Sequence, residues 1–334
     1  KLVDRLGYWD QVQDFFKKRG GDWNPVPLHR YRTFVKSMAG SGEQIAVVHA
    51  TGMIVSGASE TSPGGGFVMG GDSVSADIRR ARLNSSIKAI VLRVDSGGGS
   101  VVASEVIRRE VELAHAVKPV VVSMSDVAAS GGYWISINAN KIVADPNTIT
   151  GSIGVLIGKL NISGLYSLLG LSTDYVTTSD NATLFWDQQN FSPAQRAYIE
   201  RSIRQTYAEF TAGVAAGRNM TVKKVDEIGK GRVWSGTQAK EIGLVDELGG
   251  LDRAVDVAKQ LAQIPASQRV RIVRFPEEKS FFQMLFERER DQLTEGQSAN
   301  ARPVNARSLD AMLRKIVDTM EPVQARIPFE LHIR

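Results

Sequence analysis

Ser130 lies between small residues just after a predicted strand, which is where a nucleophilic hydroxyl can be presented. The run Asp126–Trp134 reads DVAASGGYW and follows the apolar run Val120–Met124. Small neighbours allow a substrate backbone to come close to the hydroxyl. The N–H groups of Gly131 and Gly132 open a predicted helix and can face an anionic oxygen. The pattern predicts a nucleophile at a tight strand-to-helix turn.

A second stretch repeats this design upstream. Residues Val91–Ser100 read VLRVDSGGGS, a buried-looking strand that ends in a glycine-rich turn and leads into an amphipathic helix. Two strand ends that both present free N–H groups can form an acyl-transfer site between them. The pair therefore indicates a serine hydrolase.

A serine nucleophile needs a base, and the histidines do not supply one in the expected order. The chain has four of them: His29, His49, His115 and His332. A Ser–His–Asp chain order requires a histidine shortly after the nucleophile, and the sequence has none between Ser130 and His332. A lysine can replace histidine when burial lowers the pKa of its amine, because only the free amine accepts the serine proton.

The rest of the chain alternates predicted strands and helices, which is typical of a parallel sheet flanked by helices. Strands are predicted at 44–50, 89–94, 120–124, 141–144 and 150–155, with helices at 72–83, 103–117, 130–138 and 192–217. Residues 19–43 read as a linker, residues 44–264 as the folded module and residues 265–334 as a C-terminal extension of unknown role. Within that extension strands are predicted at 269–275 and 329–333, and helices at 278–293 and 308–320.

A short sequence near the start of the chain is repeated near the end of the folded module. Leu2–Asp10 returns as Leu244–Asp252, and both copies read as a strand, a glycine turn and the start of a helix. We expect residues 1–18 to be the tail of a preceding homologous repeat that lies outside this chain. The chain begins with lysine instead of methionine, so we expect an upstream segment to have been removed.

Composition excludes several classes of function. The 334 residues carry a net charge of only +5 with interspersed signs and no basic stripe, which argues against nucleic-acid binding. No cysteine is present, so disulfides and thiolate metal sites are excluded, and we expect no metal or cofactor. No stretch is long and apolar enough to span a membrane. The loop Pro63–Gly71 lacks the Lys-Ser/Thr ending of a phosphate-binding loop.

Five ordered motifs between Gln44 and Leu261 resemble the bacterial signal peptide peptidases of SppA type, which are serine–lysine membrane proteases on the Clp/crotonase fold. The motifs are Gly70–Asp72, Ile90–Ser100, Ala128–Trp134, Thr150–Gly154 and Gly243–Asp246. The resemblance implies an α/β fold of repeated ββα units, with a mainly parallel sheet flanked by helices. It also implies that Ser130 is the nucleophile, that Gly98 and Gly131 supply the oxyanion N–H groups, and that Ser152 orients the lysine base.

Two positions depart from this pattern. Gly97 stands where the family usually has proline, and Ala182 stands where short family members carry the base lysine. Long members hold two modules, the first resembling a lysine donor and the second a serine donor. The missing lysine and the repeated sequence that begins at Leu2 together indicate that the chain is the C-terminal, serine-bearing half of a long member. We expect the lysine to come from the N-terminal module or from a neighbouring subunit of a homo-oligomer.

Other interpretations stay open at this point. Ala182 could be an engineered replacement of lysine, and Lys159 could act as a base within the chain. The module could also be an inactive scaffold. A protein of a different class, a crotonase-like acyl-CoA enzyme, shares the fold and the oxyanion geometry.

The resemblance implies that the substrates are cleaved signal peptides and other unfolded apolar segments. An extended peptide could add as a β-strand beside the serine, with side chains in apolar pockets. Candidate wall residues are Leu92, Val101, Val102 and Met124, for which core packing is the alternative role. The resemblance also implies location at the bacterial inner membrane, with the module facing the periplasm and membrane contact through a missing upstream anchor.

Overall fold

The computed structural model describes residues 15, 18, 42–61, 67–276 and 324–326. The chain divides into two compact units, Lys1–Gly42 and Glu43–Arg334. Within the first unit only Phe15, Lys18 and Gly42 are described, so the expected repeat tail and linker lie outside the described residues.

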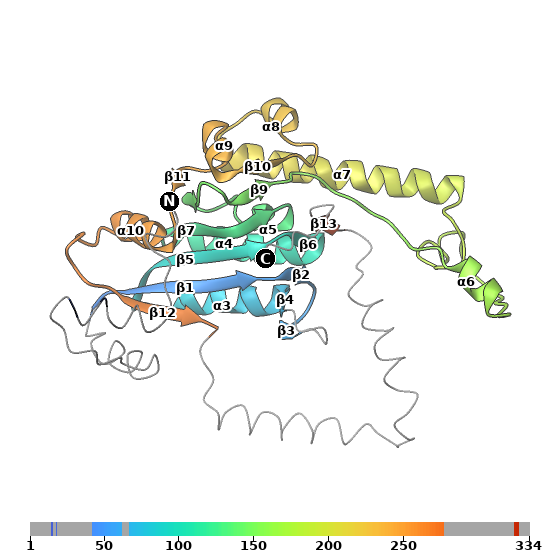
Figure 1. Ribbon diagram of the computed structural model, residues 1–334, viewed down its shortest axis with the longest axis horizontal. Helices are drawn as coiled ribbons and strands as arrows, with labels where there is room; N and C mark the ends of the chain where they lie inside the picture. Colours follow the sequence, from blue (N-terminus) through green and yellow to red (C-terminus); the bar gives the residue numbers. More distant parts are fainter. Residues whose placement is uncertain (1–14, 16–17, 19–41, 62–66, 277–323, 327–334) are drawn as a thin grey trace, which may run out of the picture. The chain divides into compact units, whose positions relative to one another are not determined.

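A mainly parallel sheet forms the centre of the second unit (Figure 1). Its strands are β1 (Gln44–Thr51), β5 (Ile87–Ser96), β7 (Val120–Ala129), β8 (Lys141–Ala144), β9 (Ile149–Gly151), β10 (Val233–Ser235), β11 (Glu247–Leu248) and β12 (Arg271–Phe275). The order is β10-β9-β7-β5-β1-β12, and β8 pairs with β7 and β11. Among the described strands of this sheet, every pairing is parallel except that of β9 with β10. The central strands are apolar on both faces, as expected for a parallel sheet covered on both sides.

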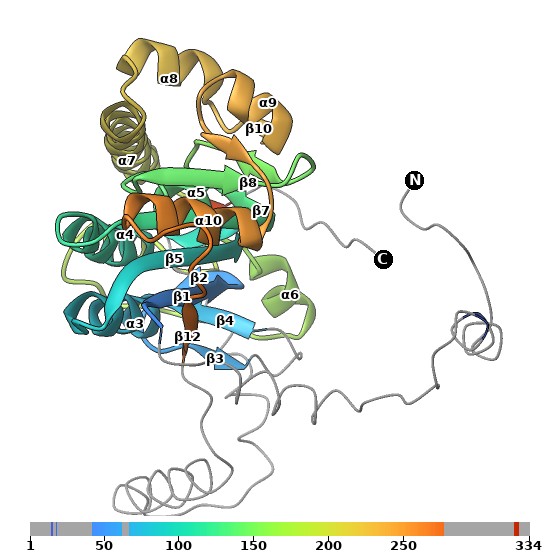
Figure 2. The same cartoon turned by 90° about the vertical axis from the view of Figure 1, so that its left-hand side faces the viewer.

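Helices cover the two faces of the sheet and create two cores (Figure 2). The larger core includes Val48 and Leu92 and packs against α3 (Gly71–Leu83) and α4 (Val101–His115). The smaller core includes Val47 and Val91 and packs against α10 (Leu251–Leu261). Successive residues of a strand point to opposite faces, which explains this division.

A second sheet stands beside the carboxyl ends of β1 and β5. It has the order β13-β6-β2-β4-β3, from β2 (Met53–Val55), β3 (Glu60–Thr61), β4 (Phe67–Gly70), β6 (Gly98–Ser100) and β13 (Gln324–Arg326). The chain passes from β1 through β2 to α3, and from β5 through β6 to α4. This succession confirms the predicted α/β fold of repeated ββα units.

Strand β7 leads directly into the short helix α5 (Gly131–Trp134), which is fixed from the far side of the chain. The hydroxyl of Tyr133 is buried and donates a hydrogen bond to the Leu244 carbonyl at 2.8 Å. Burial raises the pKa of this phenol, so it remains a donor at neutral pH. Nearby, Asp246 accepts hydrogen bonds from Arg218 at 2.9 Å and from the Ile142 N–H at 2.8 Å. These bonds hold the segment after α9 (Gly236–Glu241) against β8.

The long helix α7 (Pro193–Gly217) agrees with its predicted range, and α8 (Val222–Ile228) follows it. Between β9 and α7 lies a segment of residues 155–192, which we call the arm and which contains the helix α6 (Ser163–Leu168). Figure 1 shows the arm in green, extending away from the sheet.

Three sequence expectations differ from the structure or lie outside its described residues. The predicted helix at 130–138 is shorter, because α5 ends at Trp134 and turns follow. Strand β12 pairs with β1 in the main sheet, so the expected module boundary at 264 leaves a strand of the sheet outside the module. The helices expected at 278–293 and 308–320 and the strand at 329–333 lie outside the described residues.

Candidate active site

Ser130 has an unusual backbone conformation at the turn between β7 and α5. Its φ is 54° and its ψ is −115°, a region that costs a residue with a Cβ about 1–3 kcal/mol. Two backbone bonds maintain this conformation: the Ser130 N–H donates to the Gly151 carbonyl at 2.8 Å, and the Ser130 carbonyl accepts from the Trp134 N–H at 2.8 Å. Strain of this kind concentrates at functional sites.

The Ser130 hydroxyl is buried without a partner. The side chain has no exposed surface, and its Oγ makes no hydrogen bond within the part of the chain that is described. A buried hydroxyl left unpaired costs about 1–3 kcal/mol. No imidazole, carboxylate or amine of the described residues is hydrogen-bonded to the hydroxyl of this candidate nucleophile.

Glycine is required two residues after Ser130, at position 132. A Cβ on Gly132 would come within 2.5 Å of the Ser96 carbonyl oxygen, so helix α5 can approach the end of β5 only with glycine there. N–H groups in the first turn of a helix have no acceptor within the helix. The Gly131 N–H therefore suits the predicted oxyanion role.

The second predicted oxyanion donor differs from expectation. Gly98 has a φ of 98°, and its N–H already donates to the Ser96 hydroxyl at 3.1 Å. The sequence suggested a free N–H here, and the structure corrects this, because a serine two residues back can close a local turn. Gly98 can bind an oxyanion only if this bond to Ser96 is exchanged. Sequence reasoning missed Ser96, although its position in the SGGGS run was the available signal.

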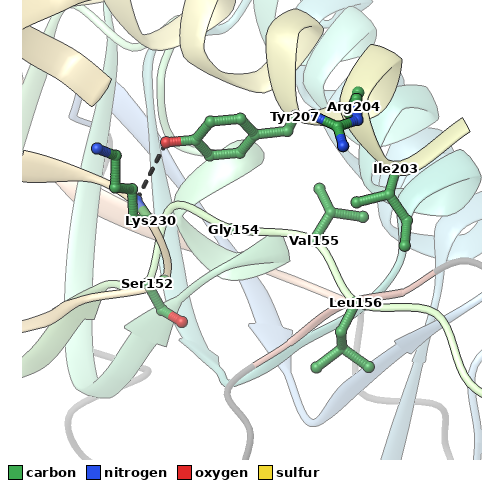
Figure 3. A pocket seen from close by; sticks show the side chains of 9 residues that line it. Ser152, Gly154, Val155, Leu156, Ile203, Arg204, Tyr207 and Lys230 are labelled. Atoms are coloured by element: carbon green, nitrogen blue, oxygen red, sulfur yellow. Dashed lines mark hydrogen bonds between the residues drawn. The ribbon is translucent and has the colours of Figure 1, made fainter. Parts of the chain in front are cut away.

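Ser152 lies next to the serine turn, since the residue before it accepts the Ser130 N–H. It is buried, has a φ of 48°, and its N–H donates to the Arg232 carbonyl at 2.7 Å. Ser152 also borders a cavity of about 420 Å³ (Figure 3). The cavity is lined by Ser152, Gly154, Val155, Leu156, Ile203, Arg204, Tyr207, Lys230 and Gly231. Figure 3 shows the Ser152 hydroxyl directed away from Tyr207 and Lys230.

The two positions considered for a lysine both lie on the arm. Ala182 is exposed in a turn between α6 and α7. The Lys159 amine has no hydrogen-bond partner in the described structure and lies 4.5 Å from the centre of the Phe191 ring. Burial lowers the pKa of this amine. The structure does not bring Lys159 into hydrogen-bond contact with Ser130.

The four candidate wall residues divide into two groups. Leu92 and Met124 have no exposed surface and belong to the larger core, so the structure assigns them the core role and not a groove wall. Val101 is partly buried against that core, and Val102 is 65% exposed at the start of α4. Only these two valines remain available to line a peptide site.

The described residues contain no group of His, Asp or Glu side chains arranged to hold a metal ion. Within the same residues no helix is long and apolar enough to cross a membrane.

The fold and the strained serine turn define an α/β protein of ββα units with a nucleophile-type serine at a strand end. The profile of peptidase family S49 matches residues 112–265. Protease 4 of Salmonella typhi is 44% identical over 271 residues, covering 79% of this chain and 43% of that protein. The chloroplastic serine protease SPPA of Arabidopsis thaliana is 36% identical over 283 residues, covering 81% and 41%.

Among solved structures, a ClpP1 point mutant from Listeria monocytogenes superposes with a TM-score of 0.41 and 15% identity, over 63% of this chain and 94% of that one. The sequence matches carry the assignment: the chain belongs to peptidase family S49 and is of SppA type. It spans less than half the length of Protease 4 and of the chloroplastic protease.

Proposed function

We propose that this chain is the C-terminal, serine-bearing half of a two-module signal peptide peptidase. Its substrates would be cleaved signal peptides and other unfolded apolar peptides. The observation that carries the proposal is the Ser130 hydroxyl, buried and unpartnered on a strained turn in a chain of family S49. The relatives named above are proteases, which favours this function over a crotonase-like acyl-CoA enzyme.

In this mechanism a neutral lysine amine takes the proton of Ser130 while Oγ attacks the peptide carbonyl. The oxyanion of the tetrahedral intermediate is held by the Gly131 N–H and by the Gly98 N–H, which leaves the Ser96 hydroxyl. Loss of one such donor typically costs about 3 kcal/mol. The protonated amine then gives its proton to the leaving amine, and water hydrolyses the acyl-enzyme with the amine as base again.

The lysine comes from outside this chain in our proposal, from the N-terminal module or a neighbouring subunit. Two observations support it: the Ser130 hydroxyl has no base bonded to it among the described residues, and the named relatives are more than twice as long as the part matched here. The sequence resemblance, which aligns Ala182 with the lysine of short family members, is consistent with this source. The exposed apolar surface of the arm supports a homo-oligomeric assembly. By the same resemblance we place the module on the periplasmic side of the bacterial inner membrane, attached through a segment outside this chain.

A fluorophosphonate probe tests the function on the two-module protein. We expect stoichiometric labelling of Ser130 and hydrolysis of apolar peptides, both abolished in Ser130→Ala. The matched control is Ser85→Ala, which removes an exposed hydroxyl in the turn between α3 and β5 and should keep both activities. Labelling at another residue, or peptide hydrolysis that survives in Ser130→Ala, would remove the nucleophile assignment. A protein that is not labelled but turns over acyl-CoA would instead be a crotonase-like enzyme. A protein that shows neither labelling nor turnover would be an inactive scaffold.

A further inference from the structure

Helix α5 is too short to fix its own direction. It contains only the four residues Gly131–Trp134, and no side-chain hydrogen bond caps its start at Ser130. An isolated helical turn is not stable in water, because its nucleation is costly. The direction of the Gly131 N–H, which the proposed mechanism places on the oxyanion, is therefore set by the groups that hold α5 in the fold.

Two neighbouring side chains hold α5 to different parts of the chain. The Tyr133 hydroxyl donates a hydrogen bond to the Leu244 carbonyl oxygen at 2.8 Å, across 111 positions of sequence. The indole N–H of Trp134 donates to the Glu105 carboxylate on α4 at 3.0 Å, and the centre of its ring lies 4.4 Å from that of Phe210 on α7. The Glu105 side chain is partly exposed, whereas Tyr133 has no exposed surface. Water therefore cannot replace the partner of the Tyr133 hydroxyl if this bond is lost.

The acceptor of the Tyr133 hydrogen bond lies in a turn that is itself fixed. Leu244 donates its N–H to the Ala239 carbonyl of α9 at 2.7 Å, and Arg218 donates its Nε–H to the Gly243 carbonyl at 3.1 Å. The bonds of the same segment to β8, described above, add a third attachment. The Leu244 carbonyl is thus a rigid anchor point for α5.

The bond between Tyr133 and Leu244 also joins two of the sequence motifs. Tyr133 belongs to the nucleophile motif Ala128–Trp134, and Leu244 belongs to the motif Gly243–Asp246, to which the proposed mechanism gives no task. Gly243 has a φ of 84°, in the left-handed region that favours glycine. The distant motif therefore builds the turn that presents the Leu244 carbonyl to α5.

We propose that Tyr133 is a positioning residue for the oxyanion site, because its buried hydroxyl ties α5 to the Gly243–Asp246 turn and so fixes the direction of the Gly131 N–H. This inference rests on the proposed function, since it takes the Gly131 N–H as an oxyanion donor. Donors of this kind are effective because they are held in place before charge develops. The Tyr133 hydroxyl acts through α5 and makes no hydrogen bond to the Ser130 hydroxyl.

Tyr133→Phe in the two-module protein tests the proposal, because it removes the hydroxyl and keeps the ring. The matched control is Thr211→Val, which removes another buried hydroxyl whose hydrogen bonds go to carbonyl groups of its own helix. Both variants lose buried hydrogen bonds, so we expect both to unfold at a lower temperature than the wild type. A shared loss of stability is therefore not the readout that decides.

The deciding readouts concern the oxyanion. We expect Tyr133→Phe alone to lower kcat/KM about 10- to 100-fold, and to weaken inhibition by a peptide aldehyde by a similar factor, because the aldehyde oxygen takes the oxyanion position once Ser130 has added to it. Binding of an uncleaved apolar peptide, measured in the Ser130→Ala background, should change by less than about twofold. Amide hydrogen exchange at Gly131–Trp134 should accelerate in Tyr133→Phe and not in Thr211→Val.

A second variant, Gly243→Ala, strains the acceptor turn from outside α5 and keeps the test decisive if Tyr133→Phe does not fold. We expect it to lower kcat/KM and aldehyde affinity together. An active wild type whose kcat/KM and aldehyde affinity are retained in the folded variants would overturn the inference alone. A wild-type protein that hydrolyses no peptide would overturn the proposed function and this inference with it.

Discussion

The serine turn and the arm are built in opposite ways. At the turn, Ser130 has no exposed surface, and Gly132 leaves no space for even one carbon atom. On the arm, helix α6 buries no residue, and Val176 is fully exposed. The large apolar side chains exposed there are Leu156, Leu160, Leu165, Leu168, Leu169, Leu171, Tyr175, Val176 and Phe185.

This difference shows which part of the site the chain completes alone. The nucleophile and its backbone are fixed by bonds within the chain, whereas the arm presents apolar surface of the kind that marks an interaction site. The arm also contains Ala182, which the sequence resemblance aligns with the lysine of short family members. Within the described residues the chain combines a rigid turn at the proposed nucleophile with an exposed apolar surface on the arm, which fits our proposal that another module supplies the base.

The largest difference between the two regions is expected when one carbon is added to a glycine in each of them. Gly132→Ala forces a contact of 2.5 Å with the Ser96 carbonyl, so we expect about 2 kcal/mol lower stability and about a 100-fold loss of peptidase activity. Gly164→Ala on the arm is the control, since nothing lies within 4 Å of its Cβ. Thermal unfolding and kcat/KM of the two-module protein measure both effects. A tolerated Gly132→Ala would mean that the turn is loosely packed.

Charges on the arm test whether its apolar surface binds a partner. Leu168→Glu and Val176→Glu add charge to side chains that are 83% and 100% exposed, so folding of this chain should be unaffected. We expect assembly to weaken and activity to fall about 30-fold, the effect of losing an interface hot spot of 2 kcal/mol. Leu83→Glu, at an exposed leucine on α3, is the control. Sedimentation measures the assembly of the variants, and kcat/KM measures their activity. If Leu168→Glu and Val176→Glu leave the assembly intact and active, the arm is not an interface.

Removing the Ser96 hydroxyl tests the bond that competes with the oxyanion. In Ser96→Ala the Gly98 N–H loses its partner in the free enzyme and keeps one only in the tetrahedral intermediate. We expect about 1 kcal/mol lower stability and about fivefold higher kcat/KM. If kcat/KM falls instead, Ser96 positions the turn and does not compete with the oxyanion.

The smallest effect is expected at Lys159. Its amine lies against Phe191 and makes no bond to Ser130, so Lys159→Met should change kcat/KM by less than about twofold, well below the loss expected for a general base. A loss of a thousandfold or more in peptide hydrolysis would instead identify Lys159 as the base.

Much of the fold and of the nucleophile half could be predicted from local patterns. Apolar runs predicted strands β5 and β7. The glycines after these strands predicted the turns that contain Gly98 and Ser130, respectively. These features depend on neighbours in sequence, which a single chain displays. The pairing of β13 with β6 joins residues that are 224 to 228 positions apart, from Gln324 with Ser100 to Arg326 with Gly98, and the two segments share no local signal. The core positions of Leu92 and Met124 likewise depended on which helix covers each face of the sheet.

The origin of the base is tested most directly by a high-resolution structure of the assembled two-module protein. The account predicts a lysine amine of another module or subunit within about 2.6–3.2 Å of the Ser130 Oγ. A base contributed by the same serine-bearing module, whether Lys159 or a histidine, would contradict it.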